Sequence, residues 1–209
     1  MHDFFTSHGA GETDAQINAD NCGGQNKNNF VIWYYSWRVL CGLHKSILYS
    51  FLIAGHTKFS PDWCFGLLKQ SFKRRYVSSL FDLMVAVDKS TVTGVNISKL
   101  CGLHDGTVLV PVYDWVTFLE PFFKKIPGIS TFHHFRFASD RPGVVFCRTF
   151  IDSPEIEFQV LKSLEIRPPS QLPHKIVPLG LSHERKRYLH REIREFCRPG
   201  TEDFVAPEP

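Results

Sequence analysis

The sequence has few of the features that would place a protein in a membrane or outside the cell. No apolar run approaches the ~20 residues that a membrane-spanning helix needs. The N-terminus has no basic stretch followed by an apolar one, so it does not resemble a signal peptide. These absences favour an intracellular protein, in the cytosol or the nucleus and with no membrane partner, whose six cysteines stay reduced.

Aromatic residues, in contrast, are abundant. The 209 residues include 19 Phe, 6 Tyr and 4 Trp, against 2 Met. Each large ring buries much apolar area, so a chain of this length can form a compact core. The hydrophobic share of 43% and the charged share of 22% are those of an ordinary globular protein. A net charge of +3 identifies no partner by itself.

The first 75 residues alternate between helical and extended patterns. We expect a helix at 3–8, a strand at 15–19, a helix at 29–43 capped by Asn28, a strand at 46–53 and a helix at 60–75. This order of helix, strand, helix, strand and helix predicts parallel strands in an α/β fold. Apolar spacing predicts one buried face on each long helix, with Trp33 and Trp37 on the first and Phe65 and Phe72 on the second.

Beyond residue 90 the pattern changes to a mixed α+β region. There we expect a helix at 114–125, a hairpin of strands at 132–137 and 144–150, a proline-bearing linker after residue 167, a helix at 183–197 and a disordered tail after Pro199. A further helix is expected at 77–88. The sequence thus predicts three parts: residues 1–90, an α+β extension at 91–167, and residues 168–209 with the linker, the last helix and the tail.

Two strings in the first third of the chain carry a resemblance. One begins at Asp20 and reads D-N-C-G-G-Q-N-K-N, and the other begins at Gly55 and reads G-H-T-K-F-S-P-D-W-C-F-G-L-L-K. Both resemble the motifs of an uncharacterised animal domain family that looks transposon-derived. That family is similar to acid-triad transposases with a ribonuclease-H-like core. The resemblance implies that residues 1–90 form part of such a core.

The resemblance also implies a site. In acid-triad transposases, carboxylates hold two divalent ions about 4 Å apart, and these ions activate the attacking oxygen and stabilise the leaving one. Asp20, at the end of a strand, and Asp62, at the start of a helix, would be ligands of Mg²⁺ or Mn²⁺. His56 would orient the phosphate or supplement the third acidic position, and Lys58 would lie near the phosphate.

One catalytic acid has no counterpart in this chain. The resemblance requires three strands and an acid ahead of residue 15, where the sequence offers only a short helix. Asp3 and Asp14 fall in the wrong elements. We therefore expect this chain alone to be inactive as a nuclease or strand transferase. The strand at 15–19 should have an open edge, or should pair with a substitute strand from the C-terminal half.

Each candidate residue also has a structural interpretation. Asp20 can close its strand with an Asx turn, and Asp62 can stabilise a helix N-terminus. The tetrapeptide Cys-Gly-Leu-His occurs twice, at 41–44 and 101–104, and its two copies could supply four zinc ligands. The usual spacing of zinc fingers is absent, so we do not expect zinc.

Basic residues suggest a second class of function. One helix ends in a cluster made of Lys69, Lys73, Arg74 and Arg75. Such cations also complement the negative end of a helix, which requires no ligand. Together with Lys58, they are our candidates for contacts to nucleic-acid phosphates, with DNA as the partner. The alternative to a truncated transposase domain is thus a non-enzymatic module that binds nucleic acid or protein. The sequence indicates no oligomeric state.

Overall fold

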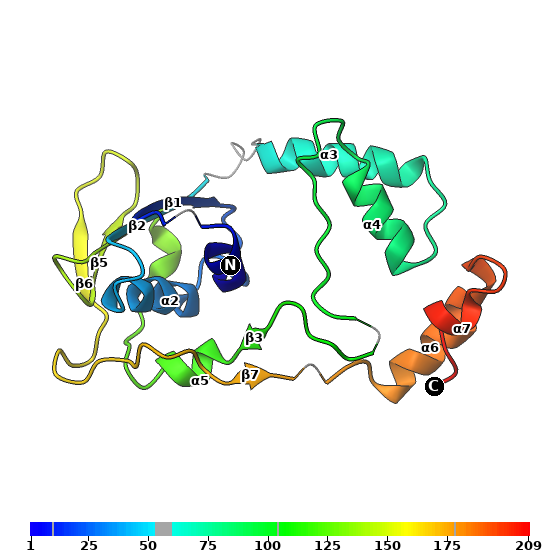
Figure 1. Cartoon of the computed structure of the whole chain (residues 1–209). Coiled ribbons are helices and arrows are strands. Elements are labelled where there is room, and N and C mark those ends of the chain that lie inside the picture. Colours follow the sequence, from blue (N-terminus) through cyan, green and yellow to red (C-terminus); the bar gives the residue numbers. More distant parts are fainter. Residues whose placement is uncertain (10, 53–59, 104, 178) are drawn as a thin grey trace. The chain divides into compact units, whose positions relative to one another are not determined.

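The computed structural model describes residues 1–9, 11–52, 60–103, 105–177 and 179–209, and the chain divides into two compact units (Figure 1). The first unit comprises Met1–Thr57 and Pro111–Ile176, and the second comprises Lys58–Val110 and Val177–Pro209. Each unit is therefore assembled from two separate stretches of chain. The parts predicted from the sequence, with boundaries at residues 90 and 167, follow the order of the chain and do not coincide with these units.

A mixed five-stranded sheet forms the centre of the first unit. Its strands, in spatial order, are β1 (Asp14–Ala19), β2 (Ser46–Phe51), β4 (His134–Ala138), β5 (Val144–Arg148) and β6 (Ile156–Gln159). β1 and β2 are parallel and are connected by α2 (Asn29–Leu40), whereas the remaining pairs are antiparallel. The α/β class, the parallel pair and the hairpin of β4 and β5 are thus confirmed.

Smaller elements complete the first unit. They are α1 (His2–Ser7), β3 (Val112–Tyr113), α5 (Trp115–Leu119), a 3-10 turn (Ile129–Thr131) and β7 (Lys175–Ile176). β3 and β7 form a separate antiparallel pair. Asp114 caps α5 as expected, but the helix ends at Leu119 and not near residue 125. Pro121 explains the early end, because proline has no N–H to donate and its ring clashes with the preceding turn.

β1 lies at one edge of the sheet. In the described part of the chain it pairs with β2 alone, while β4 pairs with the opposite side of β2. Of the two alternatives predicted for this strand, the open edge is therefore confirmed. The C-terminal half extends the sheet from β2 and supplies no partner to β1 among the described residues.

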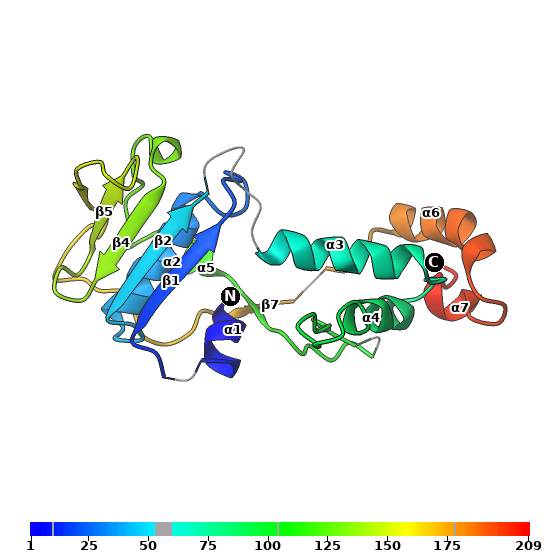
Figure 2. The same ribbon diagram turned by 90° about the horizontal axis from the view of Figure 1, so that it is seen from above.

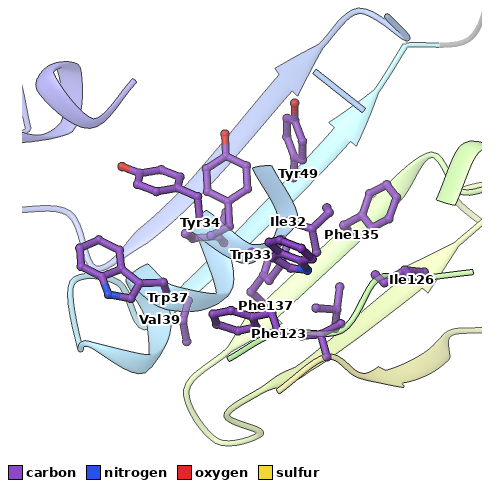
Figure 3. Packing of buried hydrophobic residues seen from close by; sticks show 14 of the residues in the cluster. Ile32, Trp33, Tyr34, Trp37, Val39, Tyr49, Phe123, Ile126, Phe135 and Phe137 are labelled. Atoms are coloured by element: carbon purple, nitrogen blue, oxygen red, sulfur yellow. The ribbon is translucent and has the colours of Figure 1, made fainter. Parts of the chain in front are cut away.

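α2 lies against one face of the five-stranded sheet (Figure 2), and aromatic side chains fill the space between them (Figure 3). Trp33, Tyr35 and Trp37 of α2 are at most 1% exposed, as are Phe135 and Phe137 of β4. The odd-numbered positions of β2 face the same core, because successive side chains of a strand point to opposite faces of the sheet. The core of the first unit is thus built mainly from rings contributed by α2, β2 and β4.

α2 is buried more completely than the sequence predicts. It begins at the expected cap, where the Asn28 side chain accepts a hydrogen bond from the Val31 N–H at 3.1 Å. All eight residues from 32 to 39 are buried, so the prediction of a single buried face is wrong. The proline-bearing segment that was expected to be a linker covers part of this helix. The Trp37 indole N–H donates to the carbonyl of Pro169 in that segment at 2.8 Å.

Charged side chains cover part of the opposite face of the sheet. Phe146 lies on this face and is only 6% exposed. The Arg136 guanidinium lies 3.8 Å from the centre of its ring, and the Arg141 guanidinium lies 5.6 Å from it. Arg136 donates two hydrogen bonds to Glu155, which also pairs with Arg148 at 3.2 Å. Flat guanidinium groups thus shield this ring, as α2 shields the rings on the other face.

The second unit consists of helices. They are α3 (Ser60–Lys73), α4 (Leu80–Asp88), α6 (His183–Ile193), a 3-10 turn (Arg194–Phe196) and α7 (Glu202–Val205). Ser182 caps α6 as expected. α7 lies in the tail expected to be disordered, and that expectation is wrong: Arg194 donates to the carbonyl of Ala206 at 3.0 Å and holds the tail. No described helix of either unit is both long enough and apolar enough to cross a membrane.

The core of the second unit is small. Its buried apolar residues, among those the structure describes, are Ala86, Cys197 and Ala206. Phe65 and Phe72 of α3 were expected to point inward but are 61% and 47% exposed, so that prediction is wrong. An apolar stripe is buried only where a partner covers it, and the nine-residue α4 is too short to cover all of α3.

A capping box fixes the start of α4. The Ser79 hydroxyl accepts a hydrogen bond from the Asp82 N–H, and the Asp82 carboxylate accepts one from the Ser79 N–H, both at 3.1 Å. Asp82 also accepts one from the Ser78 N–H at 3.1 Å. These contacts explain why the helix begins at Leu80 rather than at Val77.

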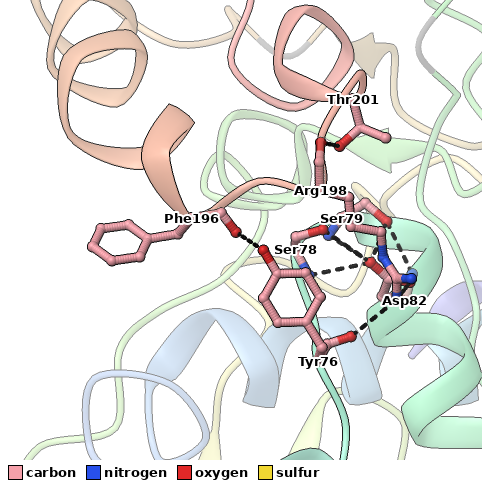
Figure 4. A network of polar contacts seen from close by, with 7 residues as sticks. All are labelled: Tyr76, Ser78, Ser79, Asp82, Phe196, Arg198 and Thr201. Atoms are coloured by element: carbon pink, nitrogen blue, oxygen red, sulfur yellow. Dashed lines mark hydrogen bonds and ion pairs between the residues drawn. The ribbon is translucent and has the colours of Figure 1, made fainter.

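Further polar contacts join the two stretches of chain within the second unit (Figure 4). Arg198 donates to Asp82 at 3.0 Å and to the carbonyl of Tyr76 at 3.2 Å. The Tyr76 hydroxyl donates to the carbonyl of Phe196. Directional polar contacts therefore connect α4 and the segment before it to the C-terminal stretch, where few apolar side chains are buried.

Candidate functional site

Asp20 directly follows β1, at the carboxyl end of a parallel strand, where α/β proteins commonly bind their ligands. Its carboxylate is exposed and is held through one oxygen. Asp20 Oδ1 accepts hydrogen bonds from the Cys22 N–H at 3.4 Å and from Asn26 Nδ2 at 2.5 Å. Within the described residues, Oδ2 accepts no hydrogen bond. That oxygen is therefore the one that a cation can reach.

The loop after Asp20 is a compact turn. The backbone N–H groups of residues 25–27 converge on the carbonyl of Cys22, at 2.9 to 3.3 Å. The Tyr49 hydroxyl of β2 donates to the carbonyl of Asn26 at 3.1 Å. Burial, and then the charge of Asp20, raise the pKa of Tyr49, so its hydroxyl stays protonated as a donor. The turn and this tyrosine together place the Asn26 side chain beside Asp20.

Lys27 points inward, although a lysine in such a motif suggests a phosphate contact. It is 5% exposed, its ammonium donates to the carbonyl of Ser130 at 3.1 Å, and it lies 5.0 Å from the centre of the Phe51 ring. Burial lowers its pKa. Lys27 therefore ties the loop to the segment before β4. Its distant partner explains why the sequence did not reveal this role.

The last two asparagines of the loop also have structural roles. Asn28 caps α2, and Asn29 Oδ1 accepts a hydrogen bond from the Ile126 N–H at 2.7 Å. The sequence predicted the cap but assigned nothing to Asn29. The signal was present in the density of asparagines, whose side chains readily bond to nearby backbone. Most of the first motif thus serves as a scaffold around Asp20.

Asp62 lies in the first turn of α3, where a negative charge is favourable. It belongs to the second unit, whereas Asp20 belongs to the first. The convergence of the two carboxylates therefore stays a prediction. His56 and Lys58, the other two candidates from the second motif, lie outside the described residues.

The described residues contain no cluster of three His, Cys, Asp or Glu side chains that could hold a metal ion. Of the four residues considered for zinc, Cys41 and His44 lie in the first unit, Cys101 lies in the second, and His104 is outside the described ranges. His44 Nδ1 accepts a hydrogen bond from Arg38 Nε at 3.1 Å in the core. His44 thus has a structural role, which a search for ligand spacing does not reveal.

The basic cluster lies along the end of α3 and just beyond it. Lys69 and Lys73 belong to the last turns of the helix, and Arg74 and Arg75 follow it. All four side chains are exposed. The structure brings two of them, Arg74 and Arg75, to the wall of one cavity.

Comparison with known proteins gives one match. The sequence model of a family described as a domain of unknown function (DUF7869) matches residues 13–151, well over half of the chain. The matched range begins next to β1, includes Asp20, Asp62 and the basic cluster, and ends after β5. No curated protein and no solved structure matches the chain significantly.

Proposed function

The chain belongs to the DUF7869 family of domains of unknown function, and we propose that it is a transposase-derived domain in which Asp20 is a ligand of a divalent metal ion. Residues 1–90 would derive from a ribonuclease-H-like core. The ancestral chemistry would be phosphodiester hydrolysis or strand transfer with two Mg²⁺ or Mn²⁺ ions. These 209 residues alone would not complete the site and would be inactive.

The way in which Asp20 is held carries the proposal. An Asx turn accounts for the bond from the Cys22 N–H to Oδ1. Asn26 adds a second donor to the same oxygen and orients the carboxylate, while the residue is exposed and Oδ2 accepts no hydrogen bond within the described residues. Partners that orient a carboxylate in this way are typical of metal ligands.

The topology around Asp20 supports the same proposal. β1, α2 and β2 form a parallel unit, and Asp20 lies at the carboxyl end of β1. In a ribonuclease-H-like core, the strand that bears the first acid would pair with the free side of β1. That side is open in the described chain, so the proposed ancestor accounts for an edge that native sheets usually protect.

In this proposal the second motif supplies the remaining groups. Asp62 would be the second metal ligand, His56 would orient the phosphate, and Lys58 would contact it. If the two carboxylates lie more than ~10 Å apart in solution, they do not share a metal pair and the assignment of Asp62 fails.

Calorimetric titration with Mn²⁺ tests the proposal. We expect the wild-type chain to bind Mn²⁺, and we expect both Asp20→Asn and Asp62→Asn to weaken binding. If the carboxylates share the ions, the double variant should bind little worse than either single variant, because the effects of groups that act together do not add. Asp152→Asn removes an exposed acid of the first unit elsewhere and is the matched control. Absence of Mn²⁺ binding, or equal loss in the control, would reject the proposal.

A cleavage assay tests the expected inactivity. The purified chain, incubated with labelled DNA and Mn²⁺, should leave the DNA intact. Cleavage that disappears in Asp20→Ala would instead show an active nuclease and overturn that part of the proposal.

The exposed basic cluster favours a second candidate function, a non-enzymatic module that binds DNA or protein on the same scaffold. A DNA partner would place the chain in the nucleus. Phosphate contacts make affinity fall steeply with salt, so binding that is unchanged between about 50 and 200 mM salt would argue against them.

A further inference from the structure

A polar cavity of about 350 Å³ lies within the second unit, between the end of α3 and the residues that follow α4. Its polar lining consists of Gln70, Ser71, Arg74, Arg75, Lys89 and Ser90. Three of these residues are cationic, two carry hydroxyl groups and none is acidic. Lys89 and Ser90 are far from the basic cluster in the sequence, so only the packing of α3 and α4 reveals that they belong to the same site.

The three cations are available to a ligand. Within the described chain, none of Arg74, Arg75 and Lys89 forms an ion pair. Within the described residues, the one hydrogen bond that any of these three side chains forms runs from Arg75 Nε to the Ser71 hydroxyl at 3.3 Å. All three side chains are exposed at the cavity, so an anion can reach them without first displacing a carboxylate.

The acids nearest in the sequence have partners of their own. Asp82 binds Arg198 at 3.0 Å. Asp88 accepts hydrogen bonds from the Ser98 N–H at 2.7 Å and from the Ser98 hydroxyl at 3.0 Å. These contacts direct both carboxylates to the C-terminal stretch and to the segment after α4, so neither lines the cavity.

Cations at the end of a helix have a simpler explanation, since they complement its negative end. At this site, however, several carbonyls near the helix ends already have donors. The N–H groups of Arg74 and Arg75 bond to carbonyls of the last turn of α3 at 3.3 and 3.2 Å. At the end of α4, the N–H and the hydroxyl of Ser90 donate to the carbonyl of Val87 at 3.0 and 2.7 Å. These carbonyls therefore do not need the guanidinium groups as donors.

We propose that this cavity binds one phosphate group of a nucleic-acid strand. Guanidinium groups match phosphate oxygens in a planar, two-point arrangement, and the lysine adds a point charge. The Ser71 hydroxyl, which accepts a hydrogen bond from Arg75, can supply a neutral donor, and the volume leaves room for the sugar attached to the phosphate. The anion site rests on the cavity itself, and only the choice of nucleic acid rests on the proposed function.

Anisotropy of a labelled oligonucleotide, measured over a salt series with the full chain and without divalent ions, tests this proposal. We expect Arg74→Gln/Arg75→Gln to weaken binding about tenfold or more. The plot of log association constant against log salt concentration should also become less steep, its slope decreasing in magnitude by about one to two. Lys186→Gln/Arg187→Gln removes the same charge from exposed positions of α6 in the same unit, and it should weaken binding less than about threefold. Equal losses in the two double variants would mean diffuse attraction and would overturn the site.

Two further measurements complete the test. Lys89→Gln alone should weaken binding by several-fold, and it keeps the test valid if the double arginine variant fails to fold. Inorganic phosphate should compete with the oligonucleotide at the cavity. Phosphate binding without oligonucleotide binding would overturn the choice of nucleic acid. Because this assay contains no divalent ion, its outcome does not depend on the Mn²⁺ titration, so a failure of the proposed metal site is distinguishable from a failure of the phosphate site.

Discussion

The two units of this chain are stabilised in different ways. In the first, α2 and the sheet enclose tryptophan, tyrosine and phenylalanine rings that are almost completely buried. In the second, the buried apolar residues among those described are small, and rings such as Trp63, Phe65 and Phe81 are more than 60% exposed. Both units have amphipathic sequences. The comparison shows that an apolar pattern tells which face a helix can bury, whereas burial itself depends on the partner.

The difference also separates the two proposed sites. Asp20 lies on the unit with the large aromatic core, where two distant groups, Tyr49 and the carbonyl of Ser130 that Lys27 contacts, hold its loop in place. The proposed phosphate site lies in the other unit, where Arg74, Arg75 and Lys89 are exposed. A metal site requires fixed ligand geometry, while a phosphate backbone tolerates flexible cations.

The largest expected effect tests the aromatic core. Trp33→Ala removes a buried ring and its hydrogen bond to the carbonyl of Lys124, and it should lower the free energy of unfolding by about 3–5 kcal/mol. Phe65→Ala in α3 should cost less than about 1 kcal/mol, because that ring is exposed. Urea unfolding monitored by circular dichroism measures both. Equal losses would mean that α3 is buried in solution and would break the comparison.

A smaller effect is expected at the charged face of the first sheet. Hydrogen bonds from Arg136 hold the pKa of Glu155 below its usual range. Glu155→Gln should cost about 1 kcal/mol at neutral pH, since both side chains are partly exposed. A lowered folded-state pKa stabilises above the unfolded value of about 4.3, and this contribution is lost as the pH falls through the folded value.

The difference in unfolding free energy between wild type and Glu155→Gln should therefore shrink between pH 7 and pH 3. Glu157→Gln, at an ion pair whose side chains are 50% and 49% exposed, is the control and should show little change at either pH. A difference between wild type and Glu155→Gln that grows on acidification would contradict this account.

In the second unit we expect a local effect. The hydrogen bond from the Ser78 N–H, followed by those from Ser79 and the charge of Arg198, lowers the pKa of Asp82 to about 2. The carboxylate should stabilise α4 above its ordinary pKa of 3.8 and lose this effect as the pH falls toward 2. Asp82→Asn should speed amide hydrogen exchange in α4 and leave α2 unchanged. A carboxyl titration near the ordinary value, followed by carbon NMR, would contradict the proposed cap.

The smallest effect is expected at Asp20. Asparagine keeps an oxygen that can accept from the Cys22 N–H and from Asn26, so Asp20→Asn should change the unfolding free energy by less than about 0.5 kcal/mol. Asp20→Ala removes the acceptor and should cost about 1 kcal/mol. If asparagine costs as much as alanine, the charge itself has a structural role and the interpretation as a metal ligand is weakened.

Local signals in the sequence predicted a large part of the fold. The caps at Asn28, Asp114 and Ser182 were predicted, because capping residues and strand patterns act over a few neighbouring positions. The open edge of β1 was one of two alternatives that followed from the resemblance. The resemblance pointed to Asp20, which the structure places at the end of β1.

The features that escaped prediction depend on distant partners. Lys27 and Arg38 are 5% exposed, and their partners include a carbonyl 103 residues away and a histidine across the end of a helix. Phe65 is exposed because, among the described residues, no neighbouring element covers its side chain. Lys89 lines the same cavity as Arg74 and Arg75 only because α3 and α4 pack together. No local pattern contains this information, because each contact forms only when the segments within a unit have packed together.

The central claim, that the exposed oxygen of Asp20 binds a divalent cation, is tested most directly by paramagnetic broadening. Substoichiometric Mn²⁺ added to the labelled chain should selectively broaden the NMR signals of the Cys22 N–H and the Asn26 side-chain amide, and Asp20→Asn should abolish this broadening. Signals that stay sharp around Asp20, or that broaden equally in the variant, would contradict the claim.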